Sequence, residues 1–305
     1  MPVGTRLFAF LLLALAACSA PPDAARVQAS KPNAPADTAQ TTCSMCAEWN
    51  RPHAPLRVYG NTHFVGTDGL SALLVTSPEG HVLIDGALPE SAPLIRANVE
   101  ALGFQMADVK LILTSHEHYD HAGGLAALQE TSGASVVARE PAARVLEAGR
   151  SGPDDPQDGD LLPFPVVDRV RRVADGETLH VGPLALTAHA TPGHTAGGTT
   201  WSWTSCEGGR CLNLVYADSL TPVSADGFRF RDAPAILADF ERTFTTVEAL
   251  PCDVLVTPHP SASRLWERVA ARDAGDADAL LDPAACTRYA RAARQRLAER
   301  LATEG

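Results

Sequence analysis

The feature that most constrains this chain is a dense run of metal-ligating residue types at positions 115–121, Ser-His-Glu-His-Tyr-Asp-His. The run follows Val109–Thr114, an apolar stretch that predicts a buried strand, and precedes Ala122–Glu130, which predicts a helix. A loop between a strand and a helix can turn several side chains toward one point, which neither regular element allows. Imidazole and carboxylate ligands together suit zinc. The candidate ligands in this run are His116, His118, Asp120 and His121.

Two further histidines occupy the same kind of position, directly after an apolar strand-like stretch. His194 lies in Thr-Pro-Gly-His-Thr, after Leu184–Ala190, and His259 lies in Thr-Pro-His-Pro, after Val254–Val256. Together with the first run they supply six donors, which is enough for two sites of three ligands that each keep an open position. Catalytic zinc sites have this three-ligand form, whereas structural zinc usually has four protein ligands.

Around these histidines the sequence resembles the metallo-β-lactamase superfamily and, within it, the class B β-lactamases of the third subclass. The resemblance extends from about residue 59 to residue 266 and lies in the segments 60–71, 83–86, 116–121, 191–195, 216–221 and 257–260. It implies a four-layer αββα sandwich, an α/β fold in which two mixed β-sheets pack face to face with helices on the outer faces. It also implies two zinc ions, one held by His116, His118 and His194, the other by Asp120, His121 and His259.

The resemblance further implies hydrolysis of the β-lactam amide bond of penicillins, cephalosporins and carbapenems, with antibiotic resistance as the result. A zinc-bound hydroxide would attack the carbonyl carbon, and Asp120 would orient it. Ser219 stands where the first subclass has a cysteine ligand, and Ser219 and Thr221 are candidate contacts for the substrate carboxylate or, alternatively, ordinary turn residues. Asp85 is a candidate for orienting a ligand histidine, or a turn residue.

Another hydrolase of the same superfamily is the main alternative, either a glyoxalase-II-like thioesterase or an acyl-homoserine lactonase. Those families use a similar histidine run with a bridging aspartate from a later strand, for which Asp218 is the candidate here. Ser219 together with Thr221, and an export signal, favour the β-lactamase. The alternative from a different class is a zinc-binding lipoprotein without catalysis, and six ligands in two half-open sites argue against it.

The rest of the chain alternates strand-like and helical stretches. Further strands are expected at 70–76, 81–85, 135–139, between 166 and 190, and at 212–217; helices are expected at 89–102, 141–148, 236–250, 263–271 and 286–301. Residues 151–165 contain four prolines and predict a loop. In this loop Gln157 and Phe164 are candidates for a wall of the substrate groove, with a plain surface loop as the alternative.

The first residues predict export. Arg6 precedes the apolar run Leu7–Ala17, which is too short to span a bilayer and fits a signal peptide over residues 1–17. Leu15-Ala-Ala-Cys18 resembles a bacterial lipobox, which makes Cys18 the lipidation candidate, and ordinary cleavage after Ala20 is the alternative. Residues 18–42, rich in Ala, Pro and Thr, predict a disordered tether, and residues 43–305 predict a single domain. We expect a periplasmic protein and a candidate outer-membrane lipoprotein with a lipid anchor.

The seven cysteines are interpreted in the light of this export signal, because disulfides form in oxidising compartments. Lipidation of Cys18 leaves six, and nearest-neighbour pairing predicts the disulfides Cys206–Cys211 and Cys252–Cys286. Cys43 and Cys46 either form a tight disulfide or pair elsewhere.

The charge of the chain bears on its partners. The formal net charge of −11 argues against a nucleic-acid-binding surface. The expected partner is a small-molecule β-lactam substrate, and the expected oligomeric state is a monomer.

Overall fold

Two mixed β-sheets form the centre of the described chain, which in this computed structural model comprises residues 43–304. The predicted signal peptide, Cys18 and the predicted tether lie outside the described residues. The described residues belong to one compact unit. Among their helices, none combines the length and the apolar character that crossing a membrane requires.

The first sheet has seven strands that follow one another in chain order. They are β1 (Leu56–Tyr59), β2 (Thr62–Phe64), β3 (Leu73–Val75), β4 (His81–Ile84), β5 (Val109–Leu113), β6 (Ser135–Ala138) and β7 (Arg171–Arg172). Strands β1 to β4 pair antiparallel and β4 to β7 pair parallel. The parallel strands β4, β5 and β6 are almost entirely buried, which explains why each has a nearly continuous apolar sequence.

The second sheet has five strands in the order β12-β11-β10-β9-β8. They are β8 (Thr178–Val181), β9 (Leu184–Ala190), β10 (Thr199–Glu207), β11 (Arg210–Tyr216) and β12 (Val254–Val256). Within this sheet β11 and β12 pair parallel and the other neighbours pair antiparallel. In β10 the buried Trp201 and Trp203 alternate with less buried polar residues, as expected for a strand with one face in the core.

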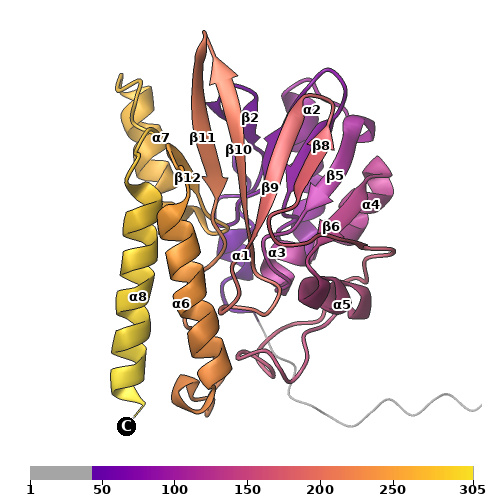
Figure 1. Ribbon diagram of the computed structural model, residues 1–305. Helices are drawn as coiled ribbons and strands as arrows, with labels where there is room; N and C mark the ends of the chain where they lie inside the picture. Colours follow the sequence, from indigo (N-terminus) through magenta and orange to yellow (C-terminus); the bar gives the residue numbers. More distant parts are fainter. Residues whose placement is uncertain (1–42, 305) are drawn as a thin grey trace, which may run out of the picture. The chain divides into compact units, whose positions relative to one another are not determined.

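Helices cover the outer faces of both sheets (Figure 1). The first sheet is covered by α2 (Ala92–Ala101), α4 (Leu125–Ser132) and α5 (Glu140–Ala148), and the second by α6 (Pro234–Ala249) and α8 (Ala285–Thr303). The remaining helices are α1 (Cys46–Trp49), α3 (Tyr119–Ala122) and α7 (Leu265–Asp273), with 3-10 turns at Pro89–Ser91, Met106–Asp108, Phe230–Asp232 and Pro260–Ser263. This layering confirms the predicted αββα sandwich.

Three clusters of buried apolar side chains hold the layers together. The cluster between the sheets contains Phe64, Ile84 and Trp201, each fully buried. A second cluster joins the first sheet to its helices, and a third joins the second sheet to α6 and α8. Aromatic residues of this size contribute the largest buried area per residue. The core therefore fixes the relative position of the strand ends that bear the candidate ligands.

The structure differs from the sequence prediction in a few elements. Strands β1, β2 and β10 were not predicted, although Trp201 and Trp203 already show the period of a strand. The helix expected at 122–130 is divided into α3 and α4 at Gly123 and Gly124. A Cβ atom on Gly124 would lie 2.2 Å from the backbone oxygen of Gly86, so this break lets the chain approach the end of β4 closely.

The described cysteines lie in three pairs. Cys206 and Cys211 face each other across the β10–β11 hairpin, and Cys252 before β12 is joined to Cys286 at the start of α8. Cys43 is joined to Cys46. This geometry is compatible with the nearest-neighbour pairing, and disulfide formation in the mature protein stays a prediction.

Candidate metal centre

All six predicted ligands follow the end of a strand. His116 and His118 lie in the loop after β5, and α3 begins directly behind them with Asp120 and His121 in its single turn. His194 follows β9 and His259 follows β12, which belong to the other sheet. The candidate centre is therefore built where the two packed sheets end side by side.

The first group of donors consists of His116, His118 and His194. Each pair of these imidazole rings has its centroids 4.9 Å apart. One ligand atom from each residue lies within 4.8 Å of the others, and all three residues are buried. Such spacing lets three nitrogens converge on one ion.

The second group is arranged around Asp120. Its Oδ2 atom lies 3.2 Å from Nε2 of His121 and 3.3 Å from Nε2 of His259. The centroids of these two imidazole rings are 4.8 Å apart. His116 also lies close to Asp120 and His121, so the two groups are neighbours. The structure thus brings together all six predicted ligands; their binding of zinc stays a prediction.

Two buried ring nitrogens show that the centre fits a cation. Nε2 of His116 and Nδ1 of His121 have no hydrogen-bond partner among the described residues. A buried polar atom without a partner costs free energy, and a metal ion at the centre would remove that cost. The donor set of five imidazoles and one carboxylate, without cysteine, is one that zinc accepts.

The charge states of His116, His194 and Asp120 also suit metal binding. Burial lowers the pKa of His116 well below its ordinary value, and burial together with the nearby His118 lowers the pKa of His194 to about 3. These rings are therefore neutral and available as ligands. Burial alone would raise the pKa of Asp120, but His121 and His259 hold it well below its ordinary value, so its carboxylate is ionised.

Ligand histidines of both groups are held from behind by oxygen atoms of the chain. Nδ1 of His116 lies 2.8 Å from Oδ1 of Asp218. Nδ1 of His194 lies 2.8 Å from the backbone oxygen of Thr221, and Nδ1 of His259 lies 3.2 Å from that of Gly69. Such acceptors fix the orientation of metal-bound imidazoles. Burial raises the pKa of Asp218 and lowers that of His116, so their contact is a hydrogen bond and not an ion pair.

Asp85 is placed differently from the prediction. Its carboxylate does not bond a histidine: it accepts hydrogen bonds from the backbone N–H of Ser115 at 2.6 Å, from the Ser115 hydroxyl at 2.7 Å and from the Tyr216 hydroxyl at 2.7 Å. Ser115, the residue before His116, donates to both carboxylate oxygens of Asp85, so neither oxygen contacts a ligand histidine. Asp85 therefore supports the start of the ligand loop, and Asp218 contacts His116 in its place.

Other candidate contacts give a mixed outcome. Ser219 is buried at the end of β11, and Thr221 is half-buried with its backbone oxygen bonded to His194. Phe164 is 7% exposed and packs in the core beneath the first sheet, so it is not a groove wall. The ring packs in the core because the loop folds back along α5, where the N–H of Phe164 donates to the backbone oxygen of Gly149 at 2.9 Å. The Gln157 side-chain amide nitrogen is buried without a partner among the described residues.

Two charged residues that sequence reasoning missed hold the loop that bears His194. Glu117 accepts a hydrogen bond from the Thr195 hydroxyl and another from the backbone N–H of Gly197, each at 2.9 Å. Arg139 donates to the backbone oxygen of Gly198 at 3.0 Å. The position of Glu117 between two ligand histidines was a sequence signal for a role at the centre. Its hydrogen-bond partners could not be predicted because they are distant in sequence.

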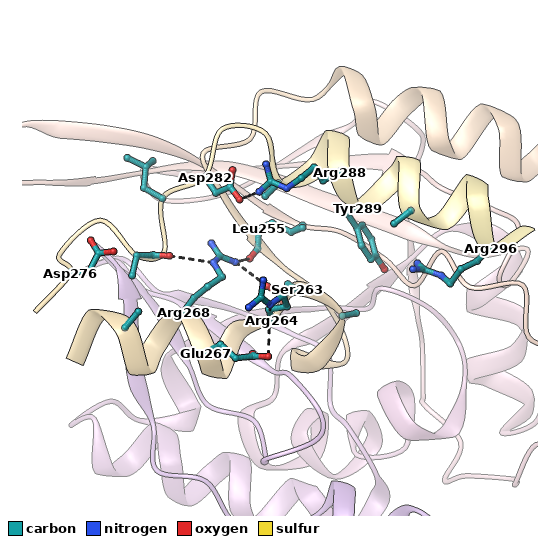
Figure 2. Close-up of a pocket in the computed structure, with 16 residues that line it drawn as sticks. Leu255, Ser263, Arg264, Glu267, Arg268, Asp276, Asp282, Arg288, Tyr289 and Arg296 are labelled. Atoms are coloured by element: carbon teal, nitrogen blue, oxygen red, sulfur yellow. Dashed lines mark hydrogen bonds and ion pairs between the residues drawn. The ribbon is translucent and has the colours of Figure 1, made fainter. Parts of the chain in front are cut away.

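A cavity of about 500 Å³ lies elsewhere, beside α7 and α8 (Figure 2). The Arg268 guanidinium beside it donates to the backbone oxygens of Leu255 at 2.9 Å and Ser263 at 3.3 Å. Arg288 pairs with Asp282. These guanidinium groups already bind groups of the chain, and the six candidate ligands do not line this cavity.

A sandwich of two mixed sheets with a histidine and aspartate centre at its strand ends defines the class of αββα metallohydrolases. The chain belongs to the metallo-β-lactamase superfamily, whose family model matches residues 65–204. It is 56% identical to the solved Rm3 metallo-β-lactamase, over 86% of this chain and 99% of that one, with a TM-score of 0.84.

Two further solved structures are similar to this chain, and one of them is a subclass B3 enzyme. MEM-A1, a subclass B3 metallo-β-lactamase isolated from a soil metagenome library, is 49% identical over 84% of this chain and 98% of that one, with a TM-score of 0.82. SMB-1 metallo-β-lactamase bound to 2-mercaptoethanesulfonate is 48% identical over 84% of this chain and 99% of that one, also with a TM-score of 0.82. The predicted family is confirmed.

Curated relatives match a smaller part of the chain. Hydroxyacylglutathione hydrolase from Bradyrhizobium sp. (strain ORS 278) is 35% identical over 107 residues, which are 35% of this chain and 32% of that protein. The match thus spans about a third of the length of this relative.

Proposed function

We propose that this protein hydrolyses the amide bond of β-lactams, including carbapenems, with two zinc ions held by the six candidate ligands. The observation that carries the proposal is the convergence of two three-donor groups without cysteine, in a chain 56% identical to a metallo-β-lactamase along nearly that protein's full length. The proposal follows from geometry and relatives together, because related folds support more than one reaction.

The residues of the chain divide the work between binding and orientation. His116, His118 and His194 would hold one zinc ion, and Asp120, His121 and His259 the other. When bound, such ions generate a hydroxide nucleophile near neutral pH and polarise the carbonyl oxygen. The ionised Asp120 can accept a hydrogen bond from the attacking oxygen and orient it. The hydroxyls of Ser219 and Thr221 are the proposed donors to the substrate carboxylate.

A direct test measures hydrolysis of a carbapenem with and without a chelator. We expect turnover that the chelator abolishes and added zinc restores. S-lactoylglutathione and an acyl-homoserine lactone are assayed beside it. Turnover of the thioester or the lactone without lactam hydrolysis would replace the proposal by the alternative hydrolase, and a zinc-loaded protein without any turnover would indicate a binding protein.

The geometry of Asp218 favours the β-lactamase over the thioesterase-like alternative. A bridging aspartate has to share the ions with the ligand histidines, but the Oδ1 atom of Asp218 bonds Nδ1 of His116, while Nε2 of that ring is the unpartnered nitrogen. Asp218 therefore lies behind the ring. It is absent from the donor groups formed by the described residues.

Ligand variants test the assignment of the two ions. We expect His194→Ala to lose the first zinc ion and His259→Ala the second, with a fall in activity of at least about 100-fold in each case because each removes a direct ligand. The exposed His180→Ala is the matched control. Zinc content and hydrolysis are measured together, and two bound ions with full activity in either ligand variant would refute the assignment.

We also propose that the protein is exported to the periplasm and acylated at Cys18. The charged start, the short apolar run and the lipobox-like segment support this. Mass spectrometry of the mature amino terminus distinguishes acylated Cys18 from cleavage after Ala20. The proposed monomeric state is tested by light scattering of the protein without its lipid.

A further inference from the structure

The loop between α5 and β7 contains an aspartate that reaches the candidate metal centre. Oδ2 of Asp155 lies 2.9 Å from Nε2 of His118, and the side chains are 8% and 3% exposed. The other carboxylate oxygen, Oδ1, accepts a hydrogen bond from the backbone N–H of Gln157 at 2.8 Å. Both oxygens of Asp155 are thus bonded, one to a candidate ligand and one to its own loop.

This contact determines which nitrogen of His118 is free. A neutral imidazole has one N–H donor and one acceptor nitrogen. With Nε2 donating to Asp155, the acceptor is Nδ1. The ring lies between its neighbours, with its centroid 4.9 Å from the centroids of both His116 and His194. The hydrogen bond therefore sets both the tautomer and the rotation of the ring.

The loop that bears Asp155 is also bonded to a second part of the protein. The backbone oxygen of Pro156, the next residue, accepts a hydrogen bond from the N–H of Ala225 at 2.9 Å. Ala225 lies on the segment that continues from Thr221, whose backbone oxygen holds His194. Two loops distant in sequence thus meet at Asp155 and Pro156, each bonded to a different ligand histidine of the first group.

We propose that Asp155 is a positioning residue of the metal centre, which orients His118 through Nε2 and joins the 151–165 loop to the first metal group. The inference rests on the proposed function only in that it needs a metal bound by His118. Carboxylates in this position raise the basicity of the ligand and hold the ring, and their loss typically weakens metal affinity 10- to 100-fold.

The test compares Asp155→Asn and Asp155→Ala with Asp154→Asn as control. Asp154 is the exposed neighbour, so its substitution removes the same charge from the same loop without touching His118. Zinc affinity is measured at pH 7 by competition with a chromophoric chelator. We expect affinity at one of the two sites to fall about 10- to 100-fold in both Asp155 variants and to stay unchanged in Asp154→Asn.

Cobalt substitution separates positioning from general stability. We expect the visible absorption of the cobalt-loaded protein to change in Asp155→Asn and to match wild type in Asp154→Asn. A structural role alone would lower the melting temperature of the metal-free protein and leave the spectrum and affinity unaltered. Wild-type affinity and spectrum in Asp155→Asn would overturn the proposal. These measurements need no substrate, so they test the role of Asp155 even if the protein does not hydrolyse β-lactams.

Discussion

Each histidine of the first metal group has one ring nitrogen bonded to an oxygen of the chain, which leaves the other nitrogen for a metal ion. The acceptors are Asp218 for His116, Asp155 for His118 and the backbone oxygen of Thr221 for His194. They come from two loops, Asp155 from the loop after α5 and Asp218 and Thr221 from the loop after β11. The ring orientations are therefore determined by the fold before any ion binds, which reduces the ordering cost of binding.

The backbone at Gly198 packs closely against Asp218, the residue that holds His116. A Cβ atom there would lie 2.4 Å from Oδ2 of Asp218 and 2.4 Å from the backbone oxygen of Thr191. We expect Gly198→Ala to destabilise the metal-free protein by about 1–3 kcal/mol, because backbone on one side and a buried carboxylate on the other must shift. Urea denaturation measures this.

The matched control is Gly152→Ala, whose Cβ would meet nothing within 4 Å. Its stability should stay within about 0.5 kcal/mol of wild type. Because Asp218 holds His116, zinc affinity should fall in Gly198→Ala and remain in the control. Equal stability of the two variants would contradict the close packing at Gly198.

Individual residues differ in how far the sequence reveals their role. The ligands could be predicted because three of the ten histidines lie within six positions and the candidate ligands follow apolar strands. Asp218, Asp155 and Glu117 were not assigned their contacts, because an aspartate or glutamate in a loop looks like a solvated residue until its partner is known. Asp85 was a candidate either for orienting a ligand histidine or for a turn, and its carboxylate bonds Ser115 and Tyr216.

At the scale of elements, strands with continuous apolar sequences were predicted best. β5 and β12 are buried and end close to the predicted positions, so the loops that follow them were placed correctly. β1 and β2 were missed because they are short and mix polar with apolar residues. The break between α3 and α4 depends on the close approach of Gly124 to Gly86, which sequence periodicity does not encode.

The cysteine pairs allow a prediction about the elements they join. The Cys252–Cys286 pair spans 34 positions and connects β12 to α8, whereas Cys206–Cys211 spans 5 within one hairpin. On the chain-entropy model the first disulfide contributes about 4 kcal/mol and the second about 2 kcal/mol. We expect the double variant Cys252→Ala/Cys286→Ala to lose more stability than Cys206→Ala/Cys211→Ala in guanidinium denaturation. The reverse order, or no loss in either, would show that these bonds are not what stabilises the fold.

At the scale of the whole molecule, the candidate centre joins the two sheets. His116 and His118 follow β5 in the first sheet, and His194 and His259 follow β9 and β12 in the second. Bound ions would thus link layers that otherwise contact each other through apolar side chains. An ion that binds only the folded state stabilises it by mass action, by about 4 kcal/mol per site when free zinc is about 1,000 times the dissociation constant.

Metal removal should therefore lower the melting temperature of the whole fold. For a domain of this size about 1 kcal/mol corresponds to roughly 2–4 °C, so a chelator should lower the melting temperature by at least about 8 °C in one cooperative transition. Added zinc should restore the melting temperature. The chelator should lower the melting temperature of His259→Ala by less, because the second metal group of this variant is incomplete. The exposed His180→Ala should behave like wild type. Calorimetry with and without chelator measures all three proteins. A melting temperature that does not respond to the chelator would mean that no ion links the sheets, since a ligand bound by residues of both layers cannot leave the stability of their assembly unchanged.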